Sequence, residues 1–164
     1  MTLSDAQTPF GFDLANRNQL FVSDDFNDAP GAGALSSWTV ADDGTLHLVS
    51  SVVPANESGA CWTLAHKDGR FVLIANTVSS AISVYSVNKE DGSVKHTRSF
   101  PSLFAPTDLG FSHDGRFLFG LDPDQGLKGS PGIRVWRFNP EDGSVTPLPG
   151  VSNLPRSVDG LVAR

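Results

Sequence analysis

Three polar residues recur at a regular spacing and could act together on one ligand. Asp25, Asn76 and Asp122 are 51 and 46 residues apart, and each closes a short apolar run. If these runs are equivalent strands around an axis, their side-chain oxygens lie at one height. Such a ring could hold a hard cation such as Ca²⁺, or orient a polar small molecule by hydrogen bonds. The alternative, which we favour, is that Asp and Asn end strands and bond their own loop backbone.

Two more candidates lie on the strand that precedes each of these runs, where Gly11, Trp62 and Asp108 occupy equivalent positions. Asp108 stands between apolar neighbours, where desolvation would raise the pKa of a carboxyl group and prepare it for catalysis. A structural Asp following Pro106 and Thr107 is the competing interpretation. Trp62 could stack on a sugar ring or pack between sheets.

Histidine and cysteine chemistry is not indicated. Cys61 is the single cysteine, so it forms no internal disulfide, and its apolar neighbours predict a buried structural thiol. The histidines are expected on outer strands or on turns remote from the ring of oxygens, and we assign them no metal: His47, His66, His96 and His113. The sequence predicts no cofactor beyond the Ca²⁺ alternative.

The segments that position these residues are repeated along the sequence. "HKDGRFVLIAN" at 66–76 returns as "HDGRFLFGLD" at 113–122, with Gly69 and Gly115 46 residues apart. Asn18 lies 51 residues before Gly69 and also tolerates positive φ, so we match it to the two glycines. Asp-Gly pairs form a second series at 43–44, 91–92 and 142–143, each following an aromatic-bearing run that contains Trp38, Tyr85 or Trp136.

Each repeat therefore contains two hairpin turns flanked by β-branched and aromatic runs, which makes four strands. A period of about 45 to 50 residues with four antiparallel strands is typical of a β-propeller blade. The predicted fold is all-β: a partial propeller with blades at approximately 8–53, 60–100 and 106–150. An extra terminal strand is expected at 157–163.

The charge and hydrophobicity of the sequence argue against some classes of binding partner. The net charge is −6, without a run of Lys or Arg, which argues against nucleic acid and anionic membranes as partners. The longest apolar runs are strand-sized rather than the length of about 20 residues that a membrane span needs. The first ten residues carry no basic start or apolar core of a signal peptide, so a cytoplasmic address is slightly favoured and the location stays undetermined.

At this point the repeats resemble a known family, the seven-bladed propeller lactonases, which include 6-phosphogluconolactonases and carboxymuconate-cyclising enzymes. The resemblance rests on "ACWTLAHKDGRFVLIANT", "APTDLGFSHDGRFLFGLD", "IRVWRFNPEDGSVTPL" and the ending "LPRSVDGLVAR". It implies a ring roughly twice as long as this chain, with a sugar-derived or muconate-type lactone as the small-molecule ligand. The ending resembles the family's C-terminal end, so we read the chain as a C-terminal half-propeller.

The resemblance also implies a catalytic His in a "Pro-Arg-His" phrase and a Glu directly after the strand-end Asn. Here the first slot holds Asp108 in "PTD", and the second is expected to hold Phe26, Thr77 and Pro123. Two functions stay open: part of a lactonase ring, or a non-catalytic binding module without the catalytic groups. Because an open arc would expose two apolar flanks, we expect self-association or a missing half of the ring.

Overall fold

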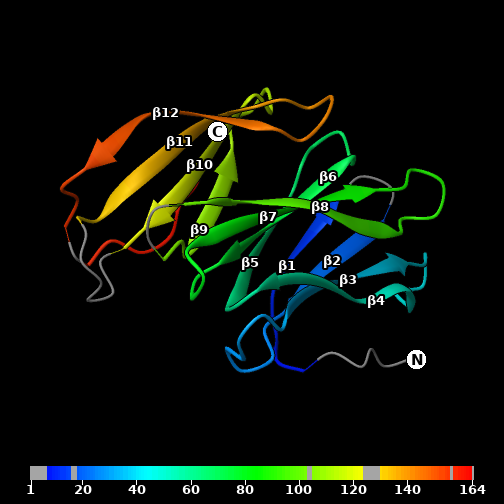
Figure 1. Ribbon diagram of the computed structural model, residues 1–164. Coiled ribbons are helices and arrows are strands. Elements are labelled where there is room, and N and C mark those ends of the chain that lie inside the picture. Colours follow the sequence, from blue (N-terminus) through cyan, green and yellow to red (C-terminus); the bar gives the residue numbers. More distant parts are fainter. Residues whose placement is uncertain (1–6, 16–17, 103–104, 124–129, 156, 164) are drawn as a thin grey trace.

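The computed structural model describes residues 7–15, 18–102, 105–123, 130–155 and 157–163. These residues form three antiparallel sheets of four strands each, and no helix (Figure 1). No helix among them could therefore span a membrane. The first sheet holds β1 (Pro9–Ala15), β2 (Gln19–Asp24), β3 (Gly33–Val40) and β4 (Leu46–Glu57); the second holds β5 (Ala60–Ala65), β6 (Phe71–Asn76), β7 (Ala81–Val87) and β8 (Val94–Pro101); the third holds β9 (Asp108–Phe111), β10 (Phe117–Asp122), β11 (Gly132–Phe138) and β12 (Val145–Ser152).

The three sheets are consecutive blades of a propeller arc, which confirms the predicted fold. Each sheet keeps its strands in chain order, and the first strands β1, β5 and β9 contact one another in turn along the inner edge. The Ser23 hydroxyl donates to the Cys61 carbonyl at 2.6 Å, and the Thr63 hydroxyl donates to the Gly11 carbonyl at 3.1 Å. These bonds join the first two blades beside the axis.

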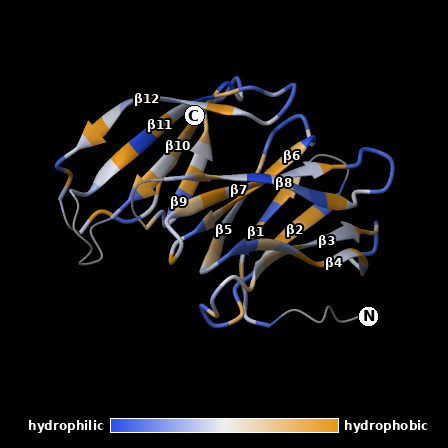
Figure 2. Ribbon diagram, in the orientation of Figure 1, coloured by the Kyte–Doolittle hydropathy of each residue, from blue (hydrophilic) through white to orange (hydrophobic). Residues whose placement is uncertain are grey.

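Apolar cores fill the spaces between blades (Figure 2). Strand β6 is buried along its whole length because its two faces pack against different neighbours. Val72 and Ile74 face the first blade, where they meet Phe21 and Leu35. The alternate residues of β6 face the third blade: Phe71, Leu73 and Ala75. This explains why the second strands read as continuous apolar runs.

The predicted equivalence of the third-strand aromatics is confirmed by the ladders. Leu20 pairs with Trp38, Val72 with Tyr85, and Leu118 with Trp136, so each aromatic residue occupies the same rung. Tyr85 and Trp136 both face the preceding blade: the Tyr85 hydroxyl donates to the Val53 carbonyl at 3.2 Å, and Trp136 packs on Phe100.

The structure corrects the alignment of the first blade by one residue. Asn18 does have positive φ, 56°, but its carbonyl accepts the bond from Val40 that the carbonyl of Arg70 accepts from Val87. Asn18 therefore corresponds to Arg70 and not to Gly69. The last residue of β2 is Asp24, so Asp24, rather than Asp25, is the equivalent of Asn76 and Asp122.

The structure also corrects the expectation of a terminal strand at 157–163. These residues carry no strand, although they lie beside β9, where the next innermost strand of a ring would be. The Leu161 amide donates to Asp108 at 2.6 Å, and Leu161 and Ala163 lie over Gly110. A strand is defined by its ladder, and in the described residues no second strand of a fourth blade is present to pair with this segment.

Candidate functional site

The second strands of the three blades end at Asp24, Asn76 and Asp122. These residues therefore lie on the same face of the arc, which we call the mouth face. Each turns toward the third strand of its own blade. Asp24 accepts from the Ser36 hydroxyl at 2.6 Å, and the Asn76 amide donates to the Ser83 hydroxyl at 2.8 Å. Asp122 accepts from Arg134 at 2.9 Å. The three partners occupy equivalent positions: Ser36, Ser83 and Arg134. Each lies on the third strand, two residues beyond the residue that pairs with the strand end in the ladder.

These bonds tie one polar atom of each side chain to its own blade, whereas the Oδ1 atoms of Asn76 and Asp122 have no hydrogen-bond partner among the described residues. Burial raises the pKa of Asp24 to about 6, against the lowering effect of the Ser36 bond. Burial also raises the pKa of Asp122 to about 6, although Arg134 lowers it. Among the described residues, no group of three or more His, Cys, Asp or Glu side chains is placed to hold a metal ion. That search leaves out amide and carbonyl oxygens such as that of Asn76, which also bind Ca²⁺, so the Ca²⁺ alternative stays a prediction.

Asp25 follows the end of β2, so the slot directly after the strand end holds Asp25, Thr77 and Pro123. The expected occupant of the first blade, Phe26, lies one residue further on. Asp25 is buried, and its Oδ2 accepts the Asp28 amide at 3.1 Å. Its Oδ1 has no hydrogen-bond partner among the described residues. Burial raises the pKa of the Asp25 carboxyl above its usual range, and the charge of Asp28 adds to the rise, whereas hydrogen bonds from the backbone amides of Asp28 and Ala60 oppose it.

Cys61 and Thr77 lie at the same junction of the first and second blades. Burial raises the pKa of the half-buried Cys61 thiol; a hydrogen bond with Thr77 opposes this shift, and the charges of Asp25 and Asp28 add to it. A thiol with a raised pKa is mostly protonated near neutral pH and is a poor nucleophile. The Thr77 hydroxyl also donates to the Pro106 carbonyl at 2.8 Å, which links the second and third blades. The charges of both Asp25 and Asp28 reach the Cys61 thiol, and of these two carboxylates Asp25 occupies the slot that directly follows the strand end.

Asp108 is half-buried on the inner edge, as the sequence predicts. Its Oδ1 accepts the Leu109 amide at 2.8 Å and its Oδ2 accepts the Leu161 amide at 2.6 Å. Asp13 makes the same kind of contact between the first two blades, to the amides of Leu14 and Ala65. Both oxygens of Asp108 are therefore engaged in holding backbone, and its catalytic role stays a prediction.

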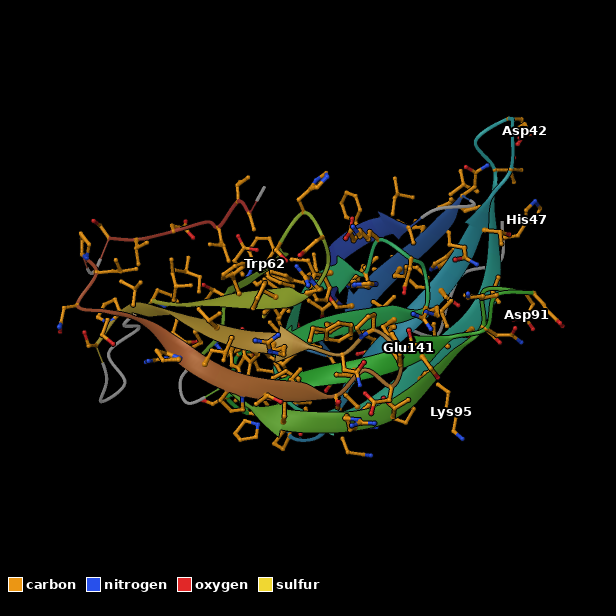
Figure 3. All side chains as sticks on the ribbon, turned by 90° about the horizontal axis from the view of Figure 1, so that it is seen from above. Asp42, His47, Trp62, Asp91, Lys95 and Glu141 are labelled. Atoms are coloured by element: carbon orange, nitrogen blue, oxygen red, sulfur yellow. The ribbon has the colours of Figure 1, made fainter. Side chains whose placement is uncertain are left out.

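Trp62 is 40% exposed and meets the edge of Phe10, at 6.0 Å between ring centres. It lies on the innermost strand β5, and Figure 3 shows it at the middle of the arc. An exposed indole beside the axis is suited to stacking on a sugar ring. Its ligand-binding role, like those of Asn76 and Asp122, stays a prediction.

His66 has a structural environment that its position in the sequence did not reveal. It is buried between the second and third blades against Phe111 and Phe138. Its Nδ1 lies 2.8 Å from Asp68, and its Nε2 lies 3.0 Å from the Gly115 carbonyl. The repeated "DGRF" turns thus contact each other across the interface, on the face of the arc opposite the mouth face.

The model of the family described as lactonase, 7-bladed beta-propeller, matches residues 5–102 and 32–159. The chain therefore belongs to the seven-bladed β-propeller lactonase family. No curated protein matches it at a significant level.

Three solved structures show the same fold. A candidate 6-phosphogluconolactonase from Bacteroides fragilis has a TM-score of 0.76 and 13% identity, over 93% of this chain and 41% of that one. The periplasmic gluconolactonase PpgL of Pseudomonas aeruginosa has a TM-score of 0.70 and 19% identity, over 88% and 39%. A functionally unknown protein from Desulfotomaculum acetoxidans has a TM-score of 0.71 and 15% identity, over 87% and 41%. The chain thus spans less than half the length of each.

Proposed function

We propose that the chain supplies three blades of a lactonase-type propeller that acts on a sugar-derived or muconate-type lactone, with Asp25 as its general base. The observation that carries the proposal is the environment of Asp25. It combines a buried carboxylate, a raised pKa and an oxygen without a partner among the described residues. A general base works best when its pKa approaches the operating pH.

The proposed reaction is hydrolysis of the lactone ester. Asp25 takes a proton from water, and the water oxygen forms a bond to the lactone carbonyl carbon. The ring C–O bond then breaks, and the leaving oxygen takes the proton back from Asp25, which gives the open hydroxy acid and restores the carboxylate. Trp62 would stack on the face of the sugar ring beside the axis. The blades that complete a ring would enclose the substrate, because the arc alone leaves the axis open.

A non-catalytic binding module is the second candidate, and a specific observation favours it. The polar side chains singled out at the strand ends and on the inner edge already hold hydrogen bonds within the fold: Asp24, Asn76, Asp108 and Asp122. In that case the mouth face would bind a sugar or lactone without turnover.

A hydrolysis assay separates the two functions. The purified chain is incubated with 6-phosphogluconolactone and with unphosphorylated aldonolactones, with and without Ca²⁺. If Asp25 is the base, Asp25→Asn lowers kcat/KM by about 100-fold or more. The matched control is Asp91→Asn, the same change in an exposed turn of the second blade, which leaves the rate unchanged. Turnover that is unaffected by Asp25→Asn refutes the assignment. Binding of the lactone without turnover supports the module.

A further inference from the structure

The two internal interfaces of the arc follow one rule. The turn between the third and fourth strands of each blade sits on the start of the second strand of the blade before it. A Cβ atom added at Gly92 would lie 2.9 Å from the Gln19 side chain, and one at Gly143 would lie 2.8 Å from the Phe71 ring. Gln19 and Phe71 are equivalent, since each begins its second strand. In the second and third blades the turn glycine is thus the contact point with the preceding blade.

Charge reinforces this contact between the second and third blades. Glu141, in the turn of the third blade, pairs with Arg70 at 3.3 Å. Arg70 comes directly before the second strand of its blade, as Arg116 does in the third blade. Asp42 holds the position of Glu141 in the turn of the first blade, two residues before its turn glycine.

The free face of the first blade, which we call the N flank, carries the half of this contact that docks on a predecessor. Gly44 has open space around it where Gly92 and Gly143 have a neighbour. Asp42 is exposed at the tip of the same turn (Figure 3). Phe12 and Leu14 of β1 are 69% and 58% exposed.

The free face of the third blade, which we call the C flank, carries the receiving half. Phe117 begins β10 as Phe71 begins β6 and is half-buried, under the guanidinium of Arg137. Arg116 precedes it with a side chain that is 67% exposed. Phe119 and Val135 pair with each other on the same face, which makes this flank apolar as well.

We propose that a second copy of this chain covers these faces, with the N flank of each copy docked on the C flank of the other. The contact repeats the internal interface: Gly44 of one copy sits on Phe117 of the other, and Asp42 pairs with Arg116. Such a head-to-tail contact is heterologous, and two three-bladed arcs joined at both flanks would form a six-bladed ring with two identical interfaces, which is one blade fewer than the family's ring and lies within the four to eight blades that propellers have. The association buries the exposed apolar side chains of β1, which gives it its driving force.

The terminal segment 157–163 competes with the incoming copy. It lies beside β9, at the place that β1 of the second copy needs, and it makes no ladder there. The Leu161 amide donates a hydrogen bond to Asp108, but the described residues of the segment form no strand ladder with the third blade, which an incoming β1 could displace. Removing it should therefore favour docking.

Light scattering and sedimentation of the purified chain give the first test. We expect a species of twice the 17.4 kDa chain mass. Phe12→Lys, on the exposed face of β1, should weaken the dimer by about 10-fold or more. Val78→Lys is the matched control, because Val78 is 57% exposed on a loop between β6 and β7. A chain ending at Leu154 should dimerise more tightly. A stable monomer of the full chain, or a monomer of the shortened chain, overturns the proposal.

A charge exchange tests the geometry at two exposed positions, with urea unfolding of each variant as a control because Arg116 also donates to Asp114 at 2.6 Å. Asp42→Arg and Arg116→Glu each place like charges at both interfaces, so each variant alone should dimerise several-fold more weakly. Mixing the two restores both contacts, one as the reversed pair and one as the native pair. Mixed dimers as strong as the parent support the proposal, whereas a mixture no stronger than either variant refutes head-to-tail docking. Loss of lactone turnover without loss of the dimer would count against the proposed function alone.

Discussion

Replacing Asp24 by Asn should make the fold more stable above pH 6 and leave it unchanged near pH 4. The Asp24 carboxyl is buried, and burial raises its pKa from 3.8 to about 6. The folded state therefore holds the proton more tightly than the unfolded chain. Consequently the free energy of unfolding falls as pH rises from about 4 to about 6, and it is level above that range.

The size of the effect follows from the shift. A difference of about 2 pKa units corresponds to about 3 kcal/mol between ionised and neutral carboxyl. Asn removes this cost, and the second blade shows that the site accepts it. Asn76 occupies the equivalent position and bonds Ser83 at 2.8 Å, as Asp24 bonds Ser36 at 2.6 Å. We expect a gain of about 1 to 3 kcal/mol at pH 7.5.

The assay is urea unfolding followed by tryptophan fluorescence at pH 4 and pH 7.5, at one protein concentration. Asp43→Asn is the control, because this exposed carboxyl has its pKa lowered by bonds from Thr45. Its substitution should have the opposite pH dependence. Asp122 titrates in the same range as Asp24, so part of the pH dependence remains in the Asp24 variant. A variant that is less stable than the parent at pH 7.5, or equally shifted at both pH values, refutes the reasoning.

Two further substitutions test the packing between the second and third blades. Leu118→Ala empties a fully buried position in that core and should cost about 2 to 5 kcal/mol of unfolding free energy, measured by urea titration. Gly115→Ala should cost more than Gly69→Ala in the same titration, by about 1 kcal/mol or more, because both glycines have positive φ but only Gly115 is in contact with the His66 ring. Equal costs for the two glycine variants would show that the ring moves aside freely.

The fold was predictable because its signals are local. Turn glycines and aromatic rungs repeat with the blade, and a four-stranded antiparallel sheet follows from two hairpins in sequence. The ladders confirm Trp38, Tyr85 and Trp136 at one rung without adjustment. The turn residues did not determine how many residues each turn contains. Asn18 and Gly69 share a positive φ but occupy different places in their turns, and the ladder with the third strand decides which residues correspond.

The terminal segment shows a second limit of local signals. Residues 157–163 have a strand-like sequence and lie where an innermost strand belongs, beside Gly110 of β9. Extended backbone becomes a strand only when a neighbouring strand completes its hydrogen bonds. The local sequence pattern does not show whether such a neighbour is present. The buried position of His66 is another example, because its contacts with Phe111 and Phe138 are made with the following blade.

The one-residue correction also changes where chemistry is expected. The strand-end position is occupied in all three blades by a polar side chain that binds its own third strand, so it serves the fold. The next position is not repeated: it holds Asp25, Thr77 and Pro123. A polar residue kept at every blade is explained by the blade, whereas the buried carboxylate of Asp25 is present at this position in one blade and is not explained in that way. An oxygen without a hydrogen-bond partner does not set it apart, because Asn76 and Asp122 each have one as well among the described residues. In a repeat protein, candidates for function are therefore better sought where equivalent positions differ.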